Sequence, residues 1–200
     1  MSLSLEPIVL ASASVSRHAM LTAADVTFAT QPAAIDERAL EREMAGAEPD
    51  EVAQALAAAK AAAVSDSNPG CWVLGSDSLL SLAGERFDKP RSRTEAAAHL
   101  RAFSGRTITL YSAAALARDG RIDWMGCDFA RLRTRDLSDG FIESYLEAEW
   151  PAVAGCVGVF RIEGRGVHLF ESIVGDQFTV LGMPLLPVLA ALRARGALVL

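Results

Sequence analysis

Two short polar segments follow apolar runs and carry the side chains best suited to chemistry. In the first, Ser12 and Ser14 offer hydroxyl groups and Arg17 offers a planar guanidinium, directly after the apolar run PIVLA. Hydroxyls, a guanidinium and the free amides of a following helix are donors that bind phosphate. In the second, Asp77 ends the run WVLGSD, whose apolar residues would desolvate its carboxylate. Taken singly, these residues could also be ordinary structural ones: a serine that caps a helix, an arginine on the surface, or an aspartate in a turn.

The chain has only two lysines, Lys60 and Lys89. Lys60 lies in an alanine-rich segment that is expected to be helical. Lys89 precedes Pro90, which biases the lysine toward an extended backbone and holds its ammonium on a stiff segment. A lysine–proline pair is also common in ordinary loops, so this pair alone indicates little.

Several functional classes are not indicated by the sequence. The three histidines, His18, His99 and His168, have neither metal-ligand spacing nor an adjacent nucleophile. Neither a Walker A pattern nor a GxGxxG fingerprint follows a strand. The net charge of −6 and the pI near 5.1 oppose a nucleic-acid or anionic-membrane surface. A small anionic ligand held by a few local cations remains the expected partner.

The composition predicts a globular protein of the cytoplasm. Hydrophobic residues make up 51% of the chain and charged residues 22%, which is ordinary for a globular domain. We expect neither a signal peptide nor a membrane span, because the N-terminus lacks a basic region and no apolar run reaches ~20 residues. Cys71, Cys127 and Cys156 form no CxxC pair, which favours buried free thiols in a reducing compartment.

The alternation of patterns predicts one α/β domain of 200 residues. Strands are expected at residues 7–11, 26–30, 71–82, 107–117, 122–132 and 167–173. Helices are expected at residues 18–24, 51–64, 94–103, 141–149 and from Pro184 to Gly196, and an acidic helix or loop is expected at residues 35–44. Hairpins at Ala83–Gly84 and Asp119–Gly120 interrupt the parallel pattern, so the expected sheet is mixed and twisted with flanking helices.

Local signals refine the ends of these elements. Asp50 is expected to cap the alanine-rich helix, and Ser138 is expected to cap the helix at residues 141–149. Ser92 and Glu95 have the spacing of a capping box for the helix at residues 94–103. The glycine-rich stretch 155–166 is expected to be a loop with short strands. Ser12 and Arg17 would then lie at the carboxyl end of a strand, the usual ligand edge of open α/β sheets.

Taken in order, these segments resemble the Maf family of nucleotide pyrophosphatases. The similar motifs are LASAS-x-x-R, IDE, a lysine in the alanine-rich helix, GSDS, KP, SGRT, the EG stretch, GDQF and LGMP. They span nearly the whole chain, and their ordered combination is far more specific than any one of them. The resemblance implies a Maf/ITPase-like fold with two lobes around a nucleotide cleft, and cleavage of a nucleoside triphosphate to a monophosphate and pyrophosphate.

The resemblance also implies roles for individual residues. Asp77 matches the catalytic acid that accepts a proton from the attacking water. The positions that line the phosphate cleft are matched by Ser12, Arg17, Lys60 and Lys89. A divalent cation, Mg²⁺ or Mn²⁺, is implied near Asp77 and Glu37. A homodimer and an association with septum formation are implied as well.

Three positions matched to base selection are Ser16, Ser78 and Glu163. The first motif departs from the common SPRR-like run, since Val15 and Ser16 replace a proline and a cation. Glu163 lies in GVFRIEG, which is similar to the GSFKSEG-like run of members that act on 7-methyl-GTP. An ionised carboxylate accepts hydrogen bonds only, which suits the adjacent N–H donors of a guanine edge.

These arguments favour a guanine-type substrate such as 7-methyl-GTP. An unpaired buried acceptor costs roughly 1–3 kcal/mol, enough for about tenfold to hundredfold discrimination. Three alternatives stay open: the same reaction on dTTP or UTP, a nucleotide-binding regulator of septum formation with little catalysis, and a purely structural domain. Glu163 could also simply pair with Arg161 or Arg165.

Overall fold

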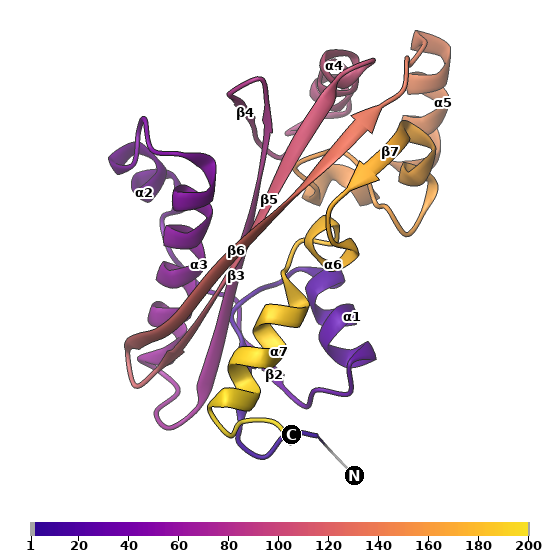
Figure 1. The fold of residues 1–200 in the computed structure, drawn as a ribbon. Helices are drawn as coiled ribbons and strands as arrows, with labels where there is room; N and C mark the ends of the chain where they lie inside the picture. Colours follow the sequence, from indigo (N-terminus) through magenta and orange to yellow (C-terminus); the bar gives the residue numbers. More distant parts are fainter. Residues whose placement is uncertain (1–2, 200) are drawn as a thin grey trace. The chain divides into compact units, whose positions relative to one another are not determined.

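The computed structural model describes residues 3–199 and confirms the expected mixed α/β fold (Figure 1). Within this range one sheet runs in the order β2-β1-β3-β5-β6-β7, with β4 paired to β3. Its strands are β1 (Ile8–Leu10), β2 (Ala29–Thr30), β3 (Trp72–Leu82), β4 (Glu85–Phe87), β5 (Thr107–Arg118), β6 (Arg121–Thr134) and β7 (Phe170–Val174). The α-helices are α1 (Val15–Ala23), α2 (Glu37–Glu43), α3 (Pro49–Ser65), α4 (Arg93–Phe103), α5 (Asp139–Glu149), α6 (Gln177–Val180) and α7 (Leu185–Ala194).

The chain divides into two compact units. Unit 1 holds the residues up to Ser78, Tyr111–Asp128 and the residues from Gln177 onward. Unit 2 holds Leu79–Leu110 and Phe129–Asp176. Within the described range, no helix is both long and apolar enough to cross a membrane.

Unit 1 is built on the parallel pairing of β1 with β2 and with β3. Successive side chains of a strand point to opposite faces, so each face of these strands has its own core. On one face Leu10 and Leu74 pack with residues of α1 and α7, among them Leu21 and Leu192. Helix α3 lies along the other face (Figure 1), where its Val64 packs with Val9, Ala11 and Val73.

Helix α3 lies unusually close to β3 because of Gly75. A Cβ atom at this position would be 2.2 Å from the Ala57 carbonyl oxygen and 2.6 Å from the Ala61 amide nitrogen. The small side chains of the alanine-rich helix and the absence of one on Gly75 therefore let the two backbones approach. This contact fixes the position along β3 that Lys60 faces.

Unit 2 combines strand extensions with two packed helices. The end of β3 turns back at Ala83–Gly84 into β4, which confirms the first expected hairpin. Helices α4 and α5 pack against each other, and β7 pairs antiparallel with the end of β6. Ser92 and Ser138 cap α4 and α5 as expected. The Glu95 carboxylate accepts from the Arg91 amide at 2.8 Å and not from the Ser92 amide, so the expected capping box is only half formed.

The structure corrects four details of the sequence-based prediction. Helix α3 begins at Pro49, so Glu48 and not Asp50 is its N-cap, with Glu51 completing a capping box. Proline is favoured in the first helical turn, where its missing amide costs nothing. The stretch 155–166 has no strand; it consists of turns and is flanked by two 3₁₀ helices, Ala152–Gly155 and Arg165–Leu169. Strand β7 starts at Phe170, after the second of these helices. The second strand is reduced to Ala29–Thr30.

Candidate active site

The loop after β1 forms a compact set of donors. Ser14 caps α1 by accepting from the Arg17 backbone amide at 3.4 Å. The Ser12 hydroxyl oxygen accepts from the Ser14 amide at 3.2 Å and from Arg17 Nη1 at 3.1 Å. Because both acceptor positions of this hydroxyl are used, its hydrogen remains available to donate. The amides of the first turn of α1 add donors without partners inside the helix.

The Arg17 side chain is buried and bonded on nearly every side. Its Nε donates to the Gly182 carbonyl at 2.9 Å, and its Nη1 donates to the Ser76 carbonyl at 2.8 Å. Its Nη2 donates to Ser78 Oγ at 3.0 Å. With the Ser12 contact, four of the five guanidinium N–H donors are used within the protein. Burial lowers the pKa of Arg17, and the nearby carboxylates of Asp77 and Glu37 oppose that change.

The position of Arg17 follows from the end of β1. Ala11 donates its amide to the Leu74 carbonyl at 2.8 Å, which is the last backbone bond between these two segments. The next carbonyl on that edge of β3, Ser76, would be buried without a partner, and Arg17 supplies one. The guanidinium thus continues the hydrogen bonding of β1 beyond its last residue.

Gly182 is a central acceptor that the sequence did not single out as a site residue. Its carbonyl oxygen accepts from Arg17 Nε, from Ser76 Oγ at 3.3 Å and from Ser78 Oγ at 3.0 Å. Its φ of +103° is a conformation that L side chains rarely adopt. The motif LGMP was the available signal, and its glycine shapes the backbone that holds Arg17 and Ser78.

Asp77, Lys60 and Glu37 meet on the opposite face of β3. The alternation of strand residues directs Ser76 and Ser78 toward Gly182 and Asp77 toward α3. Lys60 Nζ lies 2.5 Å from Asp77 Oδ1 and 2.9 Å from Glu37 Oε1. The Lys60 and Asp77 side chains are only 11% and 12% exposed, whereas that of Glu37 is 45% exposed. A buried ammonium is therefore shared by one buried and one half-exposed carboxylate.

Seven of the nine predicted site residues lie in unit 1, and the other two, Lys89 and Glu163, lie in unit 2. Ser16 is half-buried near the start of α1, and Lys89 and Glu163 are exposed. Within unit 2, burial raises the pKa of Cys156, and both Glu163 and Lys89 act electrostatically on that thiol. All three cysteines are free, as expected. They are half-buried, whereas full burial was expected.

Arg161 does not pair with Glu163 in this structure. Its Nε and Nη2 donate to Glu149 Oε2 at 3.1 Å and 2.8 Å. Across residues 3–199, the Glu163 side chain has no ion pair or hydrogen bond, whether with Arg161, Arg165 or another residue. Its carboxylate is thus free to accept from a ligand.

The residues present fit a divalent cation that is held jointly with a phosphate. No cluster of three or more His, Cys, Asp or Glu side chains suited to a metal occurs among the residues described. Asp77 and Glu37 nevertheless converge on one point, which the Lys60 ammonium occupies. Mg²⁺ typically takes only one or two protein carboxylates and completes its shell with water and phosphate oxygens.

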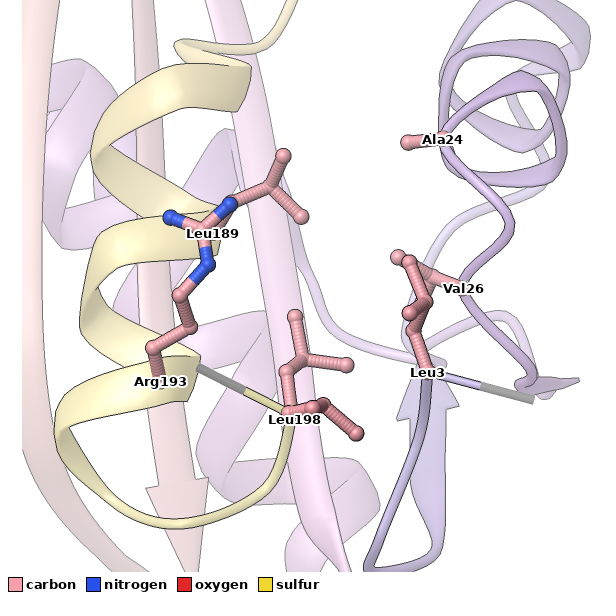
Figure 2. Close-up of a pocket in the computed structure, with 7 residues that line it drawn as sticks. Leu3, Ala24, Val26, Leu189, Arg193 and Leu198 are labelled. Atoms are coloured by element: carbon pink, nitrogen blue, oxygen red, sulfur yellow. The ribbon is translucent and has the colours of Figure 1, made fainter. Parts of the chain in front are cut away.

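A separate pocket in unit 1 lacks such chemistry. It has a volume of about 250 Å³ and shares no residue with the site around Asp77. Figure 2 shows Leu3, Ala24 and Val26 facing Leu189 and Leu198 across it, with Arg193 beside them. An apolar lining with one cation offers neither an acid nor a nucleophile.

The fold and the site define a class: an α/β protein with a loop of hydroxyl and guanidinium donors after its first strand, and a buried carboxylate on the neighbouring strand paired with an ammonium from a helix. More narrowly, the chain belongs to the Maf family, because the family model described as "Maf-like protein" matches residues 7–195.

Several curated proteins are similar to the chain over nearly its whole length. It is 47% identical over 193 residues to a nucleoside triphosphate pyrophosphatase of Nitrobacter winogradskyi, covering 96% of each protein. It is 48% identical over 188 residues to a 7-methyl-GTP pyrophosphatase of Brucella suis, covering 93% of this chain and 94% of that protein. A solved HAM1 protein of Coxiella burnetii is 19% identical with a TM-score of 0.42, covering 65% of this chain and 73% of that one.

Proposed function

We propose that the chain hydrolyses a nucleoside triphosphate to a nucleoside monophosphate and pyrophosphate. The observation that carries this proposal is the buried Asp77 carboxylate, held by Lys60 at 2.5 Å on the strand beside the donor loop of Ser12. The names of the family relatives, nucleoside triphosphate pyrophosphatase and 7-methyl-GTP pyrophosphatase, support the same reaction.

In this reaction a water molecule is added across the anhydride between the α and β phosphates. Asp77 accepts the proton of the attacking water, the P–O bond of the anhydride breaks, and pyrophosphate leaves. Lys60 fixes one oxygen of Asp77, so the other oxygen is the one that faces the water. A general base typically contributes roughly 10²–10⁴-fold to the rate.

The phosphates are bound by the donors that the protein leaves unused. These are the Ser12 hydroxyl hydrogen and the first-turn amides of α1, which suit phosphate oxygens. Arg17 uses four N–H donors internally, so its main contribution is to fix Ser12 and to supply positive charge, with one N–H left for a phosphate. Lys60 and Lys89 neutralise triphosphate charge, and Lys89 carries that role through its match to the family motif.

The divalent cation, Mg²⁺ or Mn²⁺, would be held by Asp77 and Glu37 together with phosphate oxygens. When bound, it would withdraw charge from the phosphates and stabilise the leaving pyrophosphate. Because Lys60 contacts both carboxylates in the protein alone, the ammonium and the cation compete for the same oxygens. Glu37 is half-exposed and therefore the easier of the two to release.

The finer proposal is a guanine-type substrate such as 7-methyl-GTP. Its support is the free carboxylate of Glu163, an acceptor suited to the adjacent N–H donors of a guanine edge. Pyrimidine nucleotides such as UTP and dTTP present an alternating donor and acceptor edge, which this carboxylate matches less well. Ser16 and Ser78 are proposed to tune the same choice.

The test is product analysis of the purified chain with 7-methyl-GTP, GTP, UTP, CTP and dTTP, each with Mg²⁺ and with Mn²⁺. The proposal predicts equal amounts of monophosphate and pyrophosphate, with the guanine nucleotides preferred. Release of orthophosphate in place of pyrophosphate would contradict the reaction. Pyrophosphate release with a preference for UTP or dTTP would keep the reaction and contradict the role of Glu163.

A further inference from the structure

The segment Gly158–Gly166 of unit 2 is packed so tightly that its backbone path is fixed. A Cβ atom on Gly158 would lie 2.3 Å from the Phe160 ring, and one on Gly166 would lie 2.5 Å from the Arg161 carbonyl oxygen. Val159 is fully buried with a φ of +58°, which a β-branched residue adopts only when its surroundings impose it. The two glycines allow the segment to fold closely on itself, and the strained Val159 indicates that contacts from other elements also hold it.

Two side chains of α5 supply those contacts. The Tyr145 hydroxyl donates to the Val159 carbonyl at 2.9 Å, and Glu149 accepts two hydrogen bonds from Arg161. Tyr145 and Glu149 are four residues apart and so lie on the same face of α5. Val159 and Arg161 are two residues apart in the segment, so the helix holds it at alternate residues.

The ion pair itself is unusual because its acid is buried. Glu149 is 5% exposed, and Nε and Nη2 of Arg161 donate to the same oxygen of this carboxylate. The hydrogen bond to Glu149 raises the pKa of Arg161. A buried carboxylate is costly unless it is paired and hydrogen-bonded, so the cation and its segment are held firmly in place.

Glu163 lies two residues after the anchored Arg161. The Arg161 carbonyl accepts from the Gly164 amide at 3.1 Å, which closes a tight turn with Glu163 inside it. Because the Arg161 guanidinium is engaged by Glu149, it does not neutralise Glu163 through an ion pair. The pair thus both places Glu163 and leaves its carboxylate free.

We propose that the Arg161–Glu149 ion pair is a specificity-determining device that positions the turn carrying Glu163, so that its carboxylate meets the base of the nucleotide. This inference rests on the proposed function, because it assigns a role in choosing the substrate of that same reaction. Arg161 is a positioning residue: it acts on the base only through Glu163.

The experiment compares Arg161→Met with Arg165→Met, a matched loss of a neighbouring exposed arginine that has no ion pair in the described structure. The ratio of kcat/KM for 7-methyl-GTP to that for UTP is measured for each variant. Arg161→Met is expected to change this ratio by about tenfold toward unity, mainly through KM, because the base contact is a binding contact. Arg165→Met is expected to keep the ratio of the unmodified chain.

A double-variant cycle separates this role from a general loss of structure. If Arg161 acts through Glu163, Arg161→Met has no further effect on the ratio once Glu163→Gln is present. A structural role would instead lower both kcat/KM values equally in either background. Arg161→Lys, which keeps one charged donor for Glu149, is expected to restore part of the preference.

Folding and activity are controlled separately. The variant Arg161→Met with Glu149→Gln removes the unpaired buried charge, so it should recover the thermal stability of the fold without recovering the preference. Calorimetric binding of 7-methyl-GTP and of UTP gives the same ratio without turnover. Failure of the unmodified chain to hydrolyse any nucleotide would contradict the proposed function, and the binding ratio would still decide the role of the pair. A ratio unchanged by Arg161→Met would overturn this inference.

Discussion

At the scale of residues, the central feature is one ammonium shared by two carboxylates. Lys60 and Asp77 are both nearly buried, so neither charge is solvated well by water. Their separation of 2.5 Å compensates each for that loss. The same pair that holds the proposed base in place is therefore also a point on which folding depends.

Replacing Lys60 by methionine is expected to destabilise the fold. The change leaves the Asp77 carboxylate buried without its partner, and breaking a buried pair in this way costs about 3–5 kcal/mol. Urea unfolding of Lys60→Met measures the cost. The double variant Lys60→Met with Asp77→Asn removes both charges and should recover most of it, whereas Glu37→Gln should change little because Glu37 is half-exposed. A cost for Lys60→Met as small as that for Glu37→Gln would contradict this account.

The chemistry at this scale was only partly predictable from sequence. Asp77, Lys60 and Glu37 were chosen from motif order, and the structure brings all three together. The internal bonding of Arg17 could not be foreseen, because it depends on where β1 ends and on the Gly182 carbonyl, 165 residues away along the chain. No local pattern encodes a hydrogen bond over that separation.

At the scale of elements, the contact between α3 and β3 aligns Lys60 with Asp77. The alanine-rich helix read from the sequence is present, and Gly75 explains why alanine is needed there. Strand periodicity and capping residues predicted most element positions, because those signals are local. The predictions of Asp50 as the N-cap of α3 and of short strands within residues 155–166 were wrong, because a proline occupies the first helical position and the glycine-rich stretch folds into turns.

Gly75→Ala is expected to disturb this contact. The added methyl group would overlap the Ala57 carbonyl, a backbone atom that cannot turn away, so the cost should be roughly 1–3 kcal/mol or more. Gly140→Ala is the matched control, because nothing lies within 4 Å of a Cβ atom there and alanine favours the helix. Thermal unfolding of the two variants compares them. Equal stability of Gly75→Ala and the unmodified chain would show that α3 and β3 are not packed this closely.

At the scale of the whole molecule, each of the two units is formed by several separate segments of the chain. The chain passes from one unit to the other at residues 78–79, 110–111, 128–129 and 176–177, so neither unit is a continuous segment. The expectation of one domain over residues 1–200 therefore means that the two units are expected to unfold together. Strands β3, β5 and β6 each continue from one unit into the other.

We therefore predict a single unfolding transition. Differential scanning calorimetry should give one peak whose calorimetric and van't Hoff enthalpies agree, as in a two-state protein. Two resolved peaks would contradict the single-domain interpretation. Two peaks would indicate that unit 1 and unit 2 unfold separately.

The most direct test of the account is the rate of pyrophosphate release at saturating nucleotide by Asp77→Asn beside the unmodified chain. Asparagine keeps the size of the side chain and removes its ability to accept a proton. The account predicts a folded variant whose kcat is lower by about 10²–10⁴-fold. A folded variant that releases pyrophosphate at the rate of the unmodified chain would contradict it, because the base would then lie elsewhere.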